Sequence, residues 1–251
     1  MSRSLKCITP VDGSVYVERP LASLAEAAAA LSRARAAQQA WRQVGVSDRQ
    51  GLLSRAVDAF IADGSDIARE ISWQMGRPVS QAPGEVRGFE ERARYMIEIA
   101  PQSLGAIDAG PKEGFTRFVR RDPLGVVFII APWNYPYLTA VNSVVPALMA
   151  GNAVLLKHSA QTPLCAERFA AAFQSAGLPE GLFQYLHLGH REALALIETD
   201  GVDFVAFTGS VPAGHAVQAA AAKRFIGVGL ELGGKDPAYV RADANLEHSV
   251  E

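Results

Sequence analysis

The chain has 251 residues, of which 49% are hydrophobic and 20% are charged, and its formal net charge at pH 7 is −2. This composition is that of an ordinary globular protein with one large domain or two small ones. A charge so close to zero leaves no basic excess to neutralise nucleic-acid phosphates or to hold an anionic membrane surface, so neither is an expected partner.

The sequence predicts neither a secretory signal nor a membrane span. Residues 1–10 lack the apolar core of a signal, and the best candidate for a span, 137–150, is interrupted by polar residues and falls short of about 20 residues. We therefore expect a soluble, cytoplasmic protein. Its only cysteines, Cys7 and Cys165, lie far apart without metal-ligand neighbours, so no disulfide framework or metal site is expected.

Helices are predicted for the first hundred residues. The Ala-rich segment 23–40 has apolar residues at helical spacing and charges between them, which favours a packed helix over disorder. Ser47 is predicted to cap a second helix that ends at 76–78, Gly-Arg-Pro, and a third helix is predicted from about 84 to 104. Together these segments predict an N-terminal helical region.

The pattern changes after residue 110. Residues 115–120 alternate apolar and polar side chains, which predicts a half-exposed strand in an arm. Residues 125–130 are apolar throughout, as in a strand that is buried on both faces of a parallel sheet.

Strands and helices then alternate to the end of the regular pattern. The expected elements are strand 153–156, helix 163–175, strand 182–186, helix 190–198, strand 202–207, helix 212–222 and strand 225–230. This alternation predicts an α/β fold with a doubly wound, mostly parallel, Rossmann-like sheet, and ligands beyond the carboxyl ends of the strands.

Two glycine-rich segments fall short of known nucleotide motifs. Leu232 stands where a G-x-G-x-x-G fingerprint beginning at Gly227 needs its third glycine, and His215 stands where a triphosphatase loop needs lysine. The turn from Phe207 to Ser210 still joins a strand to a helix. From these residues alone it is either an anion site at a helix N-terminus or a simple capped turn.

Two segments carry a family resemblance. Leu230 to Lys235 (L-E-L-G-G-K) and Pro132 to Pro136 (P-W-N-Y-P) resemble the aldehyde dehydrogenase superfamily, as do 151–157 and 207–210. The resemblance covers nearly the whole chain but about half of a typical member, and it looks most like succinate-semialdehyde dehydrogenases. It implies NAD or NADP as cofactor, an aldehyde substrate, and a homo-oligomer, either dimer or tetramer.

The resemblance also implies roles for single residues. Glu231 would be the general base that activates water, and the Asn134 amide would donate to the developing oxyanion. The residues expected to bind the cofactor are Ala131, Pro132, Trp133, Asn134, Lys157, His158, Ser159, Ala160, Gly209, Ser210, Leu232 and Gly233. No metal is expected.

Each role has a structural alternative. Asn134 is equally suited to cap the helix that begins near Tyr137, and Lys157 at a strand end is ordinarily solvated. Glu231 could be held by the N–H groups of the glycines that follow it. Because it lies between two leucines, desolvation is expected to raise its pKa, which suits a base.

The family often has Glu three residues beyond the lysine, where this chain has Ala160. A Glu there would repel a 2′-phosphate and hold free ribose hydroxyls, so Ala predicts dual or NADP-leaning specificity.

The resemblance implies a nucleophilic cysteine downstream of Glu231, and neither Cys7 nor Cys165 fits that role. Cys165 is predicted to be buried in a helix, and Cys7 is placed in an N-terminal tail. We therefore expect a truncated enzyme that is inactive alone. Its expected divisions are 1–110 for the helical part of the cofactor domain, 111–123 for an oligomerising β-arm, 124–237 for the Rossmann-like domain, and 238–251 for the start of a catalytic domain.

Two other functions are compatible with these residues. One is a non-catalytic module that binds NAD(P) or a protein partner. The other, ranked last, is a relative that reduces acyl phosphates, although such enzymes also need a downstream cysteine.

Overall fold

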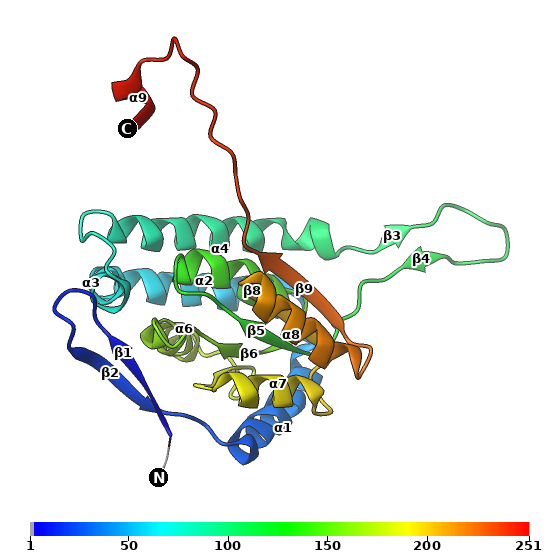
Figure 1. Cartoon of the computed structure of the whole chain (residues 1–251). Helices are drawn as coiled ribbons and strands as arrows, with labels where there is room; N and C mark the ends of the chain where they lie inside the picture. Colours follow the sequence, from blue (N-terminus) through cyan, green and yellow to red (C-terminus); the bar gives the residue numbers. More distant parts are fainter. Residues whose placement is uncertain (1–2, 251) are drawn as a thin grey trace.

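The computed structural model describes residues 3–250. Residues 1, 2 and 251 lie outside the described residues. The first predicted division begins at residue 1 and the last ends at residue 251, so these two limits lie outside them as well. The central element is a five-stranded parallel sheet in the order β7-β6-β5-β8-β9 (Figure 1). Its strands are β5 (Val126–Ile130), β6 (Ala153–Lys157), β7 (Phe183–Tyr185), β8 (Phe204–Gly209) and β9 (Gly227–Leu232).

Helices cover both faces of this sheet. On one face α5 and α6 lie against the strands, with α2, α3 and α4 outside them; on the other face lie α1, α7 and α8. Their bounds are α1 (Leu24–Trp41), α2 (Val46–Ala62), α3 (Gly64–Met75), α4 (Ala82–Leu104), α5 (Pro136–Met149), α6 (Pro163–Ser175), α7 (His190–Glu198) and α8 (Val211–Ala222). The predicted doubly wound α/β fold is confirmed.

The winding direction changes between β5 and β8. From β5 the chain moves outward through β6 to β7 along one face, and then returns to β8 and β9 along the other. In open α/β sheets, ligands bind beyond the carboxyl ends of the strands at such a switch point. The segments that follow β5 and β8 are therefore the first place to look for a site.

The core beneath the outer helices is aromatic. Phe60 of α2, Phe89 of α4, Tyr137 of α5 and Phe169 of α6 meet there, and the Phe60 and Phe89 ring centroids lie 4.0 Å apart. All four side chains are at most 3% exposed. Each buried aromatic side chain contributes on the order of 2 kcal/mol through the area it removes from water.

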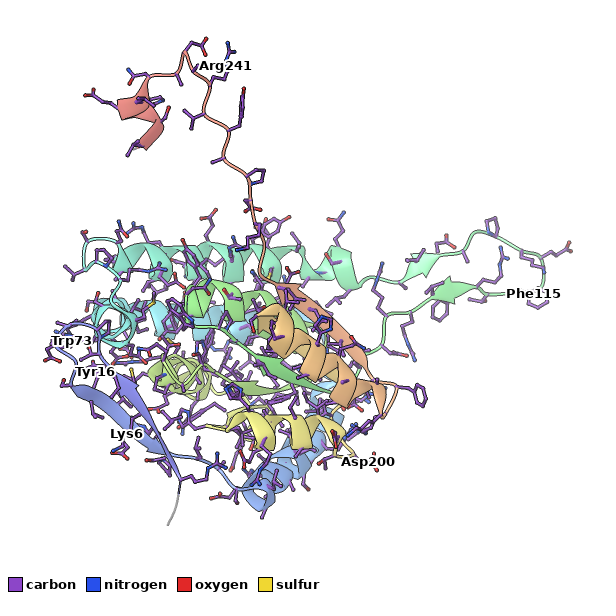
Figure 2. The ribbon with its side chains drawn as sticks, in the orientation of Figure 1. Lys6, Tyr16, Trp73, Phe115, Asp200 and Arg241 are labelled. Atoms are coloured by element: carbon purple, nitrogen blue, oxygen red, sulfur yellow. The ribbon has the colours of Figure 1, made fainter. Side chains whose placement is uncertain are left out.

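The N-terminal region differs from the sequence prediction in two ways. The antiparallel hairpin β1 (Ser4–Ile8) and β2 (Val15–Pro20) precedes the helices, so the first hundred residues are not all helical, and Cys7 lies in a strand and not in a tail. Tyr16 of this hairpin stacks on Trp73 of α3, with ring centroids 5.7 Å apart (Figure 2).

The predicted second helix is in fact two helices. A break at Asp63 separates α2 from α3, and Gly76, in the left-handed conformation, ends α3. The predicted cap at Ser47 is wrong, because Gly45 is the N-cap of α2 and makes no side-chain bond. Ser23 does cap α1, in a capping box with Glu26.

An arm extends from the end of α4 (Figure 1). The strands β3 (Ile107–Asp108) and β4 (Phe118–Val119) pair in it, and an isolated bridge joins Lys112 to Phe115. The predicted strand over 115–120 is therefore shorter than expected, and Phe115 lies near the tip (Figure 2). Beyond β9 the chain runs away from the sheet to the short helix α9 (Leu246–Val250). No helix within residues 3–250 is long and apolar enough to cross a membrane.

Candidate active site

The carboxyl ends of three neighbouring strands meet at one edge of the sheet. In the parallel register Ile130 of β5 lies opposite Phe207 of β8, and Thr208 of β8 lies opposite Glu231 of β9. Residues that follow these positions are therefore brought together although they are about a hundred positions apart in sequence.

A cavity of about 420 Å³ lies at this edge. It is lined by Pro132, Trp133, Asn134, Thr208, Gly209, Ser210, Glu231, Leu232 and Gly233. The structure thus brings both predicted catalytic residues to one cavity, together with seven of the predicted cofactor-binding positions, Asn134 belonging to both sets.

Asn134 lies in the loop between β5 and α5, and its side chain is exposed. The Oδ1 atom accepts a bond from the N–H of Tyr135 at 3.0 Å, and the carbonyl oxygen accepts one from Arg77 at 2.7 Å. The N-cap of α5 is Tyr135, which makes no side-chain cap bond. The alternative role for Asn134 as a helix cap is therefore wrong.

Glu231 lies inside β9, not beyond its end, and is exposed. Its expected desolvation between two leucines is wrong because β9 is the edge strand and Leu232 is itself 40% exposed. Within residues 3–250 its carboxylate accepts no hydrogen bond, so the alternative in which the following glycines hold it is not found either.

A second cavity, of about 440 Å³, lies beside the first, and both are lined by Ser210. Its walls are mostly apolar: Ile130, Lys157, His190, Ala193, Leu194, Phe207, Ser210, Pro212, Ala213, Ala216 and Val217. One cation, Lys157, is set among them.

Lys157 is the last residue of β6 and is only 8% exposed. The alternative in which it is an ordinary solvated lysine at a strand end is therefore wrong. Burial lowers the pKa of its ammonium. Within the described chain no carboxylate forms an ion pair with it. A buried cation in a cavity without a partner favours an anionic ligand.

The N-terminus of α8 lies at the same cavity. Ser210 is its N-cap and accepts a bond from the N–H of Ala213 at 3.4 Å, with Pro212 in the first turn. The helix dipole and free N–H groups there favour negative charge. The sequence left two interpretations of this turn, an anion site or a capped turn, and the structure is compatible with both at once.

A family model described as the aldehyde dehydrogenase family matches residues 1–251. The chain belongs to this family. It is 37% identical over 249 residues to the 3,6-anhydro-alpha-L-galactose dehydrogenase of Streptomyces coelicolor, covering 99% of this chain and 50% of that protein. It is 34% identical over 247 residues to a probable succinate-semialdehyde dehydrogenase [NADP(+)] of Synechocystis, covering 98% and 54%.

Among solved structures, PnpE in complex with nicotinamide adenine dinucleotide superposes with a TM-score of 0.93 at 30% identity, covering 99% of this chain and 51% of that one. The fold prediction is supported by this similarity. The chain spans about half the length of the curated relatives it matches.

Four residues predicted from the family pattern lie outside both cavities: Ala131, His158, Ser159 and Ala160. His158 is buried, and Nε2 lies 3.1 Å from the carbonyl oxygen of Pro136. Its Nδ1 accepts bonds from the Ser159 N–H and the Thr162 hydroxyl, each at 3.0 Å. His158 therefore joins β6 to the start of α5.

Both cysteines are buried within the fold. Cys7 and Cys165 are both 0% exposed. Burial raises the pKa of each thiol, so the reactive thiolate is disfavoured. The Cys7 sulfur is 3.0 Å from the carbonyl oxygen of Gln161, so this thiol is packed inside the fold and does not lie in a tail.

Sequence reasoning missed several groups around the site. Thr208 lines the first cavity, and Ile130 and His190 line the second. Arg77 and Glu85 hold the loop that carries Asn134. The sequence indicates Arg77 only as part of a helix ending, and nothing local signals its contact 57 positions away. No cluster of three or more metal-ligating side chains occurs in the part of the chain described.

Proposed function

We propose that this chain supplies the cofactor site and two catalytic groups of an NAD(P)-dependent aldehyde dehydrogenase. The observation that carries the proposal is the first cavity, where Asn134 from the loop after β5 meets Gly209 of β8 and Glu231 of β9. A simple structural role for each would not require one shared cavity.

The second cavity fits a dinucleotide. Its apolar walls suit an adenine ring, and Lys157 with the α8 N-terminus suits the phosphates or ribose. The bound nicotinamide would accept a hydride from the substrate. Ala160 is exposed beyond β6, and because it is not a Glu, no carboxylate at this position would repel a 2′-phosphate. The Synechocystis relative carries NADP(+) in its name. We propose use of both cofactors with a preference for NADP.

Asn134 and Glu231 have separate tasks in this proposal. The Asn134 amide donates a hydrogen bond to the substrate oxygen as negative charge develops on it. Glu231, as an exposed carboxylate at the cavity edge, accepts a proton from the water that completes the oxidation to a carboxylate.

The covalent route also needs a thiolate that forms a thiohemiacetal and then a thioester. We assign this role to a cysteine outside these 251 residues, because Cys7 and Cys165 are buried away from the cavity. On its own, therefore, the chain should bind cofactor without turning over aldehyde. The names of its relatives, which include a succinate-semialdehyde dehydrogenase, support an aldehyde substrate.

The same proposal keeps the predicted divisions of the chain. Residues 1–110 and 124–237 together form the cofactor-binding part, 238–251 lead into a catalytic part, and the arm at 111–123 joins subunits. The exposed side chains of Phe115, Phe118 and Val119 on that arm support its role in association.

Titration of the chain with NADP+ and NAD+ by calorimetry tests the proposal. We expect both to bind, and Lys157→Met to weaken NADP+ binding about tenfold or more, since a bond to a charged group is worth roughly 1.5–3 kcal/mol. Lys223→Met is the matched control, because Lys223 is exposed and, among residues 3–250, forms an ion pair with Glu198 alone. A folded chain that binds neither cofactor would refute the proposal.

A further inference from the structure

Two charged side chains outside both cavities contact the loop that carries Asn134. Arg77 follows α3, and Glu85 lies in the first turn of α4. One terminal nitrogen of Arg77 donates to the Asn134 carbonyl oxygen at 2.7 Å, and the other donates to Glu85 Oε2 at 2.8 Å. The guanidinium also lies over the ring of Tyr135, 4.6 Å from its centroid.

Glu85 is connected to the helix that follows the same loop. Its Oε1 accepts bonds from the N–H groups of Tyr137 and Leu138, both at 3.0 Å. These are free donors of the first turn of α5, whose N-cap residue offers no side-chain bond. A carboxylate from α4 thus caps α5, where the helix dipole favours negative charge.

Burial makes this arrangement hard to deform. Glu85 is 0% exposed and the Arg77 side chain is 14% exposed. A carboxylate in such a place is tolerated only when it is paired and hydrogen-bonded, so removal of either partner leaves a buried charge uncompensated. Glu85 therefore fixes both Arg77 and the start of α5.

A purely structural ion pair would need no more than these helix contacts. Arg77 adds a bond to the Asn134 backbone and a stacking contact with Tyr135, which extends the contacts into the segment lining the first cavity. Both oxygens of Asn134 are then used, because Oδ1 accepts the Tyr135 N–H. Within residues 3–250, the side-chain Nδ2 donates to no protein group and stays available to a ligand.

We propose that Arg77 and Glu85 are positioning residues for Asn134. The inference rests on the proposed function, in which the Asn134 amide donates to the substrate oxygen. By holding the loop at Asn134 and at the start of α5, the pair keeps that donor in place before substrate arrives, which is the condition for effective oxyanion stabilisation. Lysine cannot replace Arg77 here, because it lacks the planar fork that bonds two acceptors while stacking on an aromatic ring.

The test uses the whole chain labelled with ¹⁵N at asparagine, of which it has four. The Asn134→Ala variant assigns the Asn134 signals, and Asn152, buried and bonded through its side-chain nitrogen, serves as internal reference. The variants are Arg77→Gln and Arg77→Lys. Arg94→Gln is the matched control, because Arg94 lies on α4 and pairs only with two surface carboxylates.

We expect the backbone and side-chain amide signals of Asn134 to move in both Arg77 variants and to stay in place in Arg94→Gln. The Asn152 signals should not move in any of them, which separates a local change at Asn134 from general unfolding. Unmoved Asn134 signals in a folded Arg77 variant overturn the proposal. If Arg77→Gln does not fold, Arg77→Lys decides by the same criterion.

Amide hydrogen exchange tests the part played by Glu85. In Glu85→Gln, which weakens a charge-assisted cap, the amides of Tyr137 and Leu138 should exchange roughly 10- to 100-fold faster. Unchanged exchange overturns the role of Glu85. If this variant does not fold, exchange of the same two amides is measured in Arg77→Lys, which disturbs the ion-pair partner of Glu85. Faster exchange is expected there as well.

Addition of NADP+ or NAD+ to the wild-type chain separates this inference from the proposed function. Asn134 signals that respond to neither cofactor but move in the Arg77 variants would refute the cofactor site and support the positioning of Asn134. Asn134 signals that respond to cofactor but stay in place in the Arg77 variants would support the cofactor site and refute the positioning of Asn134.

Discussion

His158 is neutral in the folded chain because of its surroundings. Burial lowers its pKa to about 4, from an ordinary value of 6.5, and the nearby Lys157 ammonium acts in the same direction. Its Nδ1 already accepts two hydrogen bonds, so a proton there would displace both. The sequence showed this residue only as a member of the segment after β6, because burial depends on elements that are far away in the chain.

The stability of the fold should therefore fall with acid through His158. The unfolded state binds a proton below about pH 6.5 and the folded state only below about pH 4, so stability falls as the pH drops through this window, by roughly 3 kcal/mol in total. Urea unfolding at pH 7 and pH 4 should show a smaller loss in His158→Gln than in wild type. His215→Gln, at an exposed position, is the control and should lose as much as wild type.

Glu231 shows how a residue can be recognised while its environment is misjudged. The run from Leu230 to Lys235 identified it as a candidate base, but its neighbours in sequence suggested burial. Exposure is decided by the strand's place in the sheet, and β9 is at the edge. The place of this residue at the cavity was predictable, and its solvation was not.

At the scale of elements, the alternating strands and helices were predicted within a few residues. Helices α6 and α7 have the predicted bounds, because Pro163 and His190 begin clear periodic runs. The β1–β2 hairpin was missed because its support is remote: Cys7 contacts Gln161, 154 positions away. The break between α2 and α3 was missed because both sides keep the same apolar spacing.

Two glycines end neighbouring helices in the same way and allow a matched test. Gly151 after α5 and Gly177 after α6 both have positive φ, at 87° and 80°. A Cβ on Gly151 would lie 2.8 Å from an Arg49 nitrogen, whereas one on Gly177 would meet nothing within 4 Å.

Replacement of each glycine by alanine should therefore destabilise to different extents. Gly177→Ala should cost about 1–2 kcal/mol for the left-handed backbone alone, and Gly151→Ala a further 1–3 kcal/mol for overpacking against Arg49. Chemical denaturation of the two variants measures the difference. Equal losses would show that Arg49 yields freely, contrary to its bonds with the carbonyl oxygens of Trp41 and Met149.

At the scale of the whole molecule, the arm carries exposed apolar side chains away from the described fold (Figure 1). Phe115 is 66% exposed and Phe118 58% exposed. Exposed apolar side chains on a short two-stranded hairpin favour association with another surface.

Sedimentation at micromolar concentration should detect species heavier than the 26.8 kDa chain. The double substitution Phe115→Lys and Phe118→Lys should shift them toward the monomer, while Val79→Lys, at another exposed apolar position, should not. A wild-type chain that sediments as a single monomer would contradict the proposed role of the arm.

The β1–β2 hairpin is synthesised long before the residues that hold it in place. It is held by groups made much later: Arg19 bonds to Glu167, 148 positions on, and Arg3 bonds to Glu192, 189 positions on. A two-stranded hairpin is at best marginally stable alone, and ribosomes add about 5–20 residues per second. For roughly 10 to 40 seconds, therefore, a growing chain would carry this hairpin without its partners. Cys7 would be open to oxidation or to a chaperone until Gln161, whose carbonyl oxygen lies 3.0 Å from its sulfur, has been added.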